Sequence, residues 1–149
     1  MTRDDRSDQS RRTLTIGARL AEIDKARAFL REFLTQFLLN EEEFFKLELA
    51  LVEICVNISR YAYSGKDGTI VVTLWTRPGF CIEIRDSGRP FDPRLVPPPD
   101  LDNLVASGRR GGLGVYLART LVEEFSYRRE GGENVVTLSH CLTLSPSVR

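Results

Sequence analysis

The sequence predicts a single α/β domain, an α+β two-layer sandwich with helices on one face of a mixed, mostly antiparallel sheet. Three observations lead to this fold class. The chain has 149 residues, which is the size of one ordinary domain. With 42% hydrophobic and 28% charged residues, it has the composition of a globular protein. Segments with the periods of strands and helices follow in the order β-α-α-β-β-loop-α-β-β.

The N-terminal half is expected to contain one strand and two helices. Residues 1–11 are polar and charged, so we expect a tail there, and residues 12–16 alternate as in a short strand. Apolar residues keep a helical period from residue 19 to residue 39. Asn40 and the three glutamates after it are typical of a helix N-cap with an acidic first turn. The second helix should therefore begin there and run to about Tyr63.

The C-terminal half is expected to contain two hairpins, with a loop and a third helix between them. Four segments alternate like strands: residues 69–76, 80–85, 125–129 and 134–142. A loop rich in Gly, Pro and Asp is expected from residue 86 to about residue 110, where it would form a lid. The third helix should span about residues 112–124, and residues 143–149 are expected to form a second tail.

Composition excludes several classes of function. The 21 basic and 21 acidic side chains balance to zero net charge, which argues against direct nucleic-acid binding. Three cysteines without a CxxC pair and a single histidine argue against a disulfide framework or a zinc site. No apolar stretch is long enough for a membrane helix, and the first residues do not resemble a signal peptide. We therefore expect a cytoplasmic protein without a membrane partner.

The second expected helix carries Glu53 and Asn57 four residues apart, a spacing that places both side chains on one stripe. A carboxylate and an amide oxygen can serve as a general base and a ligand for a hard cation. A solvated helix edge is the plainer interpretation, and the pair alone does not decide between the two.

Asp86, Ser87 and Gly88 directly follow the strand 80–85. Asp and Gly at the end of a strand are typical of a turn. The same carboxylate could accept a hydrogen bond from an amino group, and Gly88 would let a flat ring approach the backbone. Both interpretations stay open from these residues alone.

Four glycines and two adjacent arginines occur within residues 108–114, just before the third expected helix. Backbone N–H groups at a helix N-terminus are suited to phosphate. The segment lacks the GK[ST] of a Walker A loop, and no strand leads into it as in a Rossmann fold. A flexible linker is the alternative.

Together and in this order, the three segments resemble the N, G1 and G2 boxes of the GHKL ATPases. They are most similar to the anti-sigma-factor serine/threonine kinases of the RsbW and SpoIIAB type. The matching motifs are E-x-x-x-N with Tyr-Ala-Tyr after it, D-x-G-x-x-F-D-P at residues 86–93, and R-G-G-L-G at residues 110–114. The resemblance covers roughly residues 12–142 and implies a Bergerat-type ATP-binding fold in a GHKL-type kinase domain over that range.

The sequence departs from the family pattern at two places. Tyr61 stands where the family usually has His, so the hydrogen-bond partners around the base would differ. The Thr often found near the final strand has no clear counterpart, because Asn134 or Val135 stands there. We therefore carry over no adenine contact from that position.

The resemblance implies a role for each residue of the site. Glu53 would be the catalytic base, and Asn57 would hold Mg²⁺. Asp86 would take the adenine amino group of ATP, with Gly88 beside the ring. The remaining cofactor-binding residues would contact the phosphates: Arg110, Gly112, Leu113 and Gly114.

The implied function is that of a Mg-ATP-dependent serine/threonine protein kinase and anti-sigma regulator of transcription. Such a partner-switching protein phosphorylates a STAS-domain anti-sigma antagonist and sequesters a sigma factor or another partner, and the family also implies a homodimer. A non-catalytic, ATP-gated protein-binding module is the main alternative, but the presence of Glu53 favours catalysis because binding alone needs no base. A histidine-kinase catalytic domain is a third, less favoured alternative.

Overall fold

A five-stranded sheet forms one layer of the molecule. The computed structural model describes residues 11–38, 40–76, 79–95, 119–120, 122–140 and 145–146. The strands lie in the order β1-β3-β4-β6-β5, and every neighbouring pair is antiparallel. Their bounds are β1 (Arg12–Gly17), β3 (Thr69–Trp75), β4 (Phe80–Asp86), β5 (Glu124–Glu130) and β6 (Glu133–His140). The described sheet is therefore wholly antiparallel, where the sequence had suggested a mixed one.

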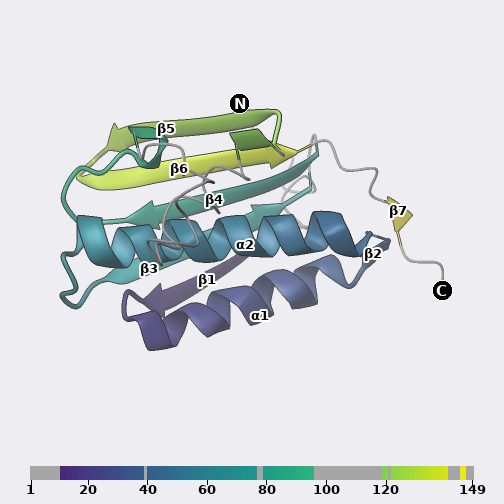
Figure 1. Cartoon of the computed structure of the whole chain (residues 1–149), viewed down its shortest axis with the longest axis horizontal. Coiled ribbons are helices and arrows are strands. Elements are labelled where there is room, and N and C mark those ends of the chain that lie inside the picture. Colours follow the sequence, from purple (N-terminus) through teal and green to yellow (C-terminus); the bar gives the residue numbers. More distant parts are fainter. Residues whose placement is uncertain are drawn as a thin grey trace, which may run out of the picture.

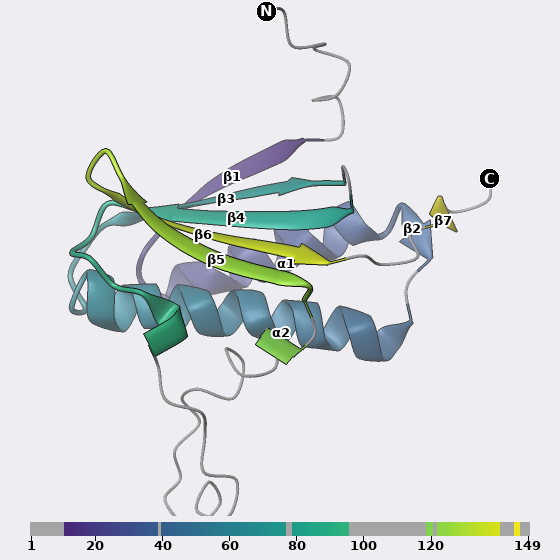
Figure 2. The same ribbon diagram turned by 90° about the horizontal axis from the view of Figure 1, so that it is seen from above.

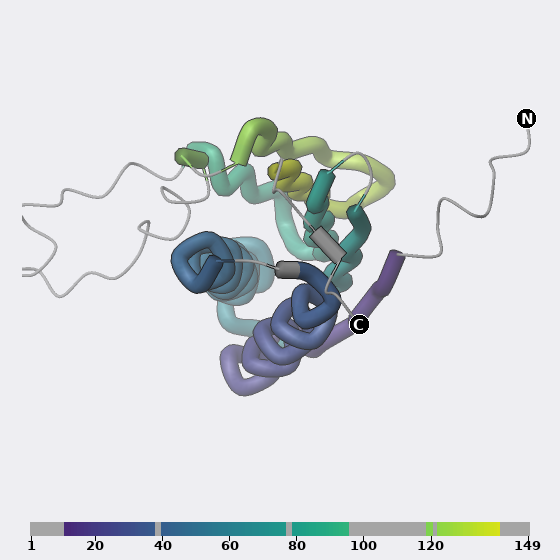
Figure 3. The backbone as a smooth tube through the Cα atoms, turned by 90° about the vertical axis from the view of Figure 1, so that its right-hand side faces the viewer, coloured from purple at the N-terminus to yellow at the C-terminus, as the bar shows by residue number. Residues whose placement is uncertain are grey.

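Two helices form the second layer. They are α1 (Ile23–Leu34), which follows a short 3-10 helix at Leu20–Glu22, and α2 (Glu41–Asn57). Figure 1 shows the two helices side by side and antiparallel, and Figure 3 shows both on the same face of the sheet. This arrangement confirms the expected two-layer α/β sandwich.

The first helix is shorter than its apolar period predicts. It ends at Leu34 instead of residue 39, and Phe37–Leu38 forms a short strand, β2, that pairs with β7 (Ser145–Pro146). The backbone must leave the helix here because Asn40, the N-cap of α2, is extended and accepts a hydrogen bond from the Glu43 amide at 2.8 Å. β7 lies within the range expected to be a tail.

The second helix reaches the residue that the sequence predicts, but its last turn is wider than an α turn. Ile58–Ala62 forms a π-helix, and the amide of Tyr63 donates to the Ile58 carbonyl five residues back at 3.0 Å. Ser64 and Gly65 then adopt positive φ values of 54° and 74° and end the helix.

The second hairpin confirms its predicted turn, with Gly131 and Gly132 both at positive φ between β5 and β6. The expected third helix was placed too far toward the C-terminus, because Glu124 already belongs to β5 and the Glu123 amide donates to the Ser139 carbonyl of β6. Residues 119–120 are helical, whereas residues 96–118, which include the expected lid and the start of this helix, lie outside the described residues.

The hydrophobic core fills the space between the two layers. Its fully buried side chains come from both helices and from the three central strands, and they include Leu30, Leu47, Leu51, Ile54, Ile70, Ile82, Ile84 and Leu138. Figure 2 shows the C-terminal end of α2, the loop after β4 and the β5–β6 turn at the same end of the molecule. Two buried polar residues, Asp86 and Asn134, lie at this end of the core.

Candidate functional site

Asp86 is the last residue of β4, and only 2% of it is exposed. Its Oδ1 accepts hydrogen bonds from the Gly88 amide and from Asn134 Nδ2, each at 2.9 Å. Its Oδ2 is buried and has no hydrogen-bond partner in the described part of the chain. Buried polar atoms are rarely left unpaired, so Oδ2 is an acceptor to which a ligand donor can bind.

The charge of Asp86 depends on its surroundings. Burial raises the pKa of the carboxyl group above its usual value, and Glu133 raises it further. The hydrogen bonds from Asn134 and Gly88 and the positive charge of Arg129 lower this pKa. The donors around Oδ1 therefore favour the ionised form against the effect of burial.

Asn134 connects Asp86 to β5 and to the loop after β4. It lies opposite Asp86 in the β4–β6 register and is 1% exposed. Its Nδ2 donates to Asp86 Oδ1 at 2.9 Å and to the Arg89 carbonyl at 2.8 Å. Its Oδ1 accepts from the Tyr127 hydroxyl at 2.6 Å and from the Phe91 amide at 3.1 Å. Both donors and both acceptor positions of this amide are used within the protein.

The loop after β4 is joined to the π turn that follows α2. The Arg89 amide donates to the Ala62 carbonyl at 2.9 Å, and Arg89 Nε donates to the Tyr61 carbonyl at 2.6 Å. On the other side, Arg129 donates to the Gly88 carbonyl at 2.8 Å. A Cβ atom at Gly88 would lie 2.6 Å from the Ala62 oxygen, so the close approach of loop and helix requires a glycine there.

Asn57 lies at the C-terminal end of α2 and is not on a solvated helix edge. It is 4% exposed, and its Nδ2 is buried without a hydrogen-bond partner in the described residues. Because a half-turn of the amide exchanges its nitrogen and oxygen, this side chain can present either a donor or an acceptor. It is the second unpaired buried polar group at this end of the molecule.

Glu53 lies one turn before Asn57 and is half-buried. Burial raises the pKa of its carboxyl group, and the charge of Arg60 acts in the opposite direction. Across the described residues, no hydrogen bond or ion pair engages this carboxylate. A carboxylate of raised pKa without a fixed partner can accept a proton from a substrate.

Tyr61, which stands at the usual position of a family histidine, packs against the loop after β4. Its ring stacks on Phe91 with centroids 5.2 Å apart and an interplanar angle of 25°. The residue is 46% exposed. Tyr61 lies within the π turn, whereas Asn57 is the last residue of α2.

The structure thus places the loop that follows Asp86 against the π turn that follows α2. The roles of Glu53, Asn57, Asp86 and Gly88 stay predictions. The four residues expected to contact phosphates, Arg110, Gly112, Leu113 and Gly114, lie outside the described residues. Their roles stay predictions.

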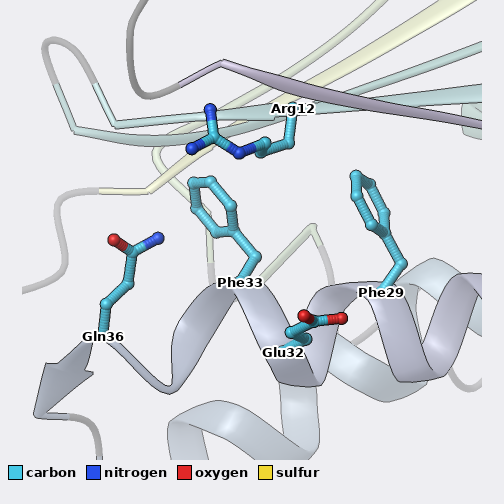
Figure 4. Close-up of a pocket in the computed structure, with 5 residues that line it drawn as sticks. All are labelled: Arg12, Phe29, Glu32, Phe33 and Gln36. Atoms are coloured by element: carbon cyan, nitrogen blue, oxygen red, sulfur yellow. The ribbon is translucent and has the colours of Figure 1, made fainter.

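Other features of the described residues do not add to this site. No group of three His, Cys, Asp or Glu side chains in the described ranges could hold a metal ion, and none of the described helices could span a membrane. A cavity of about 240 Å³ lies between α1 and β1 (Figure 4), lined by Arg12, Phe29, Glu32, Phe33 and Gln36. It lies toward the opposite end of the sheet, because Arg12 pairs with Leu74 whereas Asp86 pairs with Ile70.

Sequence reasoning missed the part that Asn134 plays. The signal in the sequence is an asparagine at the start of an apolar run, one residue beyond a Gly-Gly turn and separated from it by Glu133. Its meaning depends on the pairing of β6 with β4, which places Asn134 opposite Asp86 although 48 residues separate them. Local patterns do not contain that pairing.

Comparisons with known proteins agree with this geometry. The sequence model of the family described as "Histidine kinase-like ATPase domain" matches residues 16–140. The serine-protein kinase RsbW of Bacillus pumilus is 32% identical over 63% of this chain and 63% of its own. The serine/threonine-protein kinase BtrW of Bordetella bronchiseptica is 33% identical over 64% of this chain and 68% of its own.

A solved structure has the same fold. It is the crystal structure of the RsbU and RsbW domains of Rv1364c from Mycobacterium tuberculosis, with a TM-score of 0.59 and 23% identity. The match covers 93% of this chain and 34% of that longer protein. At this identity the likeness establishes the fold of the domain and nothing more specific.

Proposed function

Because the chain belongs to the histidine kinase-like ATPase domain family, we propose that it is an ATP-dependent serine/threonine protein kinase of the RsbW type. It phosphorylates a STAS-domain anti-sigma antagonist and sequesters a sigma factor or another partner. The named relatives support the kinase activity, although the matched region covers about 63% of the length of the RsbW relative. A homodimer and a cytoplasmic location belong to the same proposal and rest on the family resemblance.

The observation that carries this proposal is the buried, unpaired Oδ2 of Asp86. An acceptor of this kind, at the end of a strand, fits the amino group of adenine. Gly88 then lies beside the base, in a loop held against Ala62. Arg110, Gly112, Leu113 and Gly114 contact the phosphates in this proposal, with Arg110 offsetting their negative charge.

The end of α2 fits the chemical step. Asn57 holds Mg²⁺ through its amide oxygen, which a half-turn of the buried, unpaired amide makes available. Through this ligand, Asn57 would place the positive charge of Mg²⁺ beside the phosphates, where it would offset their negative charge. Glu53 orients the attacking hydroxyl and takes its proton, a task suited to a half-buried carboxylate of raised pKa.

Incubation with γ-labelled ATP and a panel of STAS-domain proteins tests the proposal. We expect label on a serine or threonine of one STAS protein, and transfer about 10²-fold slower or more by the Glu53→Gln variant. Retention of a partner that depends on ATP, without any transfer by the wild-type protein, would favour the ATP-gated binding module instead.

A further inference from the structure

The free hydrogen-bonding capacity around Asp86 is restricted to one atom. Oδ1 already accepts two hydrogen bonds, from Gly88 and Asn134, and the Asn134 amide has used both donors and both acceptor positions. Asn134 therefore has no group left with which to contact a nucleotide. Only Oδ2 of Asp86 is buried and unpaired within this cluster.

We propose that Asn134 is a positioning residue that makes the site select a purine with a 6-amino group over one with a 6-carbonyl group. This role rests on the proposed binding of the adenine amino group by Asp86. Asn134 acts by engaging Oδ1 and leaving Oδ2 as a pure acceptor. A 6-amino group donates to that acceptor, whereas a 6-carbonyl oxygen meets another acceptor and is rejected.

The selectivity requires the ionised form of Asp86. A proton on Oδ2 would turn this atom into a donor, which suits a 6-carbonyl group and opposes a 6-amino group. The charges of Arg129 of β5 and Glu133 of β6 act on Asp86, and Asp86 in turn contributes to the raised pKa of the buried Cys55 thiol of α2. Among the neighbours that favour the charged form, Asn134 is the side chain bonded directly to the carboxylate.

Asn134 also controls the second donor to Oδ1. It donates to the Arg89 carbonyl and accepts from the Phe91 amide, so it fixes the loop that contains the Gly88 amide. Both hydrogen bonds to Oδ1 therefore depend on Asn134, one directly and one through the loop. Replacing Asn134 should therefore change Asp86 Oδ2 as a hydrogen-bond acceptor more than the loss of any other single hydrogen bond in the cluster would.

The Asn134→Asp variant tests the role with almost no change in shape. One carboxylate oxygen can still accept from Tyr127 and Phe91, but the other takes the place of Nδ2 and faces Asp86 Oδ1. Two carboxylates at this distance share a proton, so Asp86 loses its full negative charge and its Oδ2 becomes a weaker acceptor for a 6-amino group. We expect the preference for ATP over inosine triphosphate, measured by competition at pH 7, to fall about tenfold or more.

Tyr127→Phe is the matched control. It removes the 2.6 Å hydrogen bond at the opposite end of the Asn134 amide and leaves both Nδ2 bonds in place. Its preference for ATP should stay within about threefold of the wild type, since a neutral hydrogen bond remote from the base contributes little. A merely structural role for Asn134 would weaken both nucleotides equally and leave their ratio unchanged.

The outcomes separate the two proposals. If the wild-type protein binds ATP and inosine triphosphate equally well, the role of Asp86 in the proposed function fails. If the wild type prefers ATP and a folded Asn134→Asp variant keeps the same preference, the role of Asn134 is overturned while that of Asp86 stands.

A measurement on the wild-type protein covers the case in which the variant does not fold. The side-chain NH₂ of Asn134 should exchange with deuterium far more slowly than that of the exposed Asn40, and equally slowly with ATP bound. Rapid exchange at Asn134 would overturn the proposed role.

Discussion

The substitution Asp86→Asn changes one atom at the proposed adenine site and should affect binding and stability in opposite directions. The amide oxygen can take the place of Oδ1 and keep the two 2.9 Å hydrogen bonds from Gly88 and Asn134. The NH₂ group then takes the place of Oδ2. It is a hydrogen-bond donor and would face the adenine amino group, which is also a donor.

The expected loss of affinity is that of one hydrogen bond to a charged group, about 1.5–3 kcal/mol. Even the lower value, about 1.5 kcal/mol, weakens ATP binding about tenfold. Calorimetric titration with Mg-ATP at pH 7 measures this change.

The free protein should become no less stable. Burial raises the pKa of Asp86, so its folded pKa lies above its unfolded pKa. The protonated Asp86 carboxyl contributes to the free energy of unfolding at pH values below its pKa in the unfolded state. This contribution is lost as the pH rises through its pKa in the folded state. At neutral pH the buried charge therefore destabilises the free protein, and the neutral amide should give an equal or higher Tm. Unchanged ATP affinity would refute the adenine role, and a lower Tm would refute the account of the buried charge.

Three further predictions concern α2 and the loop after β4. Glu53→Gln should lower the rate of phosphorylation by about 10²-fold or more while ATP affinity is retained. The wild-type rate should fall as the pH is lowered through the pKa of Glu53, which lies above that of an ordinary glutamate. A variant that phosphorylates at the wild-type rate would exclude Glu53 as the base. Asn57→Ala should remove the dependence of ATP binding on Mg²⁺, which calorimetry with and without the ion measures. Gly88→Ala should lower the free energy of unfolding in urea by about 1–3 kcal/mol, because the new Cβ would lie 2.6 Å from the Ala62 oxygen. The control Gly17→Ala, whose Cβ meets only the flexible Glu22 side chain, should have a smaller effect.

The elements that could be predicted from the sequence are those with local causes. The cap at Asn40 fixed the start of α2, and the Gly131-Gly132 turn fixed the β5–β6 hairpin. The candidate residues Glu53, Asn57 and Asp86 were found because their motifs keep fixed spacings along the chain. The π turn that follows α2 contacts the loop after β4 through Tyr61 and Ala62, so the first two motifs are adjacent in the fold.

The features that could not be predicted depend on contacts between distant parts of the chain. Phe37 keeps the helical period of α1, yet it pairs with Pro146 across more than 100 residues. The four hydrogen bonds of the Asn134 side chain require β4, β5 and the loop after β4 to meet around it. The π turn leaves no signature in apolar spacing, since its residues are buried at Ile58 and Ala62 as in an α-helix.

The loop after β4 also caps the helical segment that carries Glu53 and Asn57. The last carbonyls of a helix have no amide partner within it, and those of Tyr61 and Ala62 accept instead from Arg89 Nε and from the Arg89 amide. The loop that follows Asp86 therefore ends the helix on which the other two candidate residues lie. Fraying of this helix end and opening of the loop should occur together, as one local unfolding event.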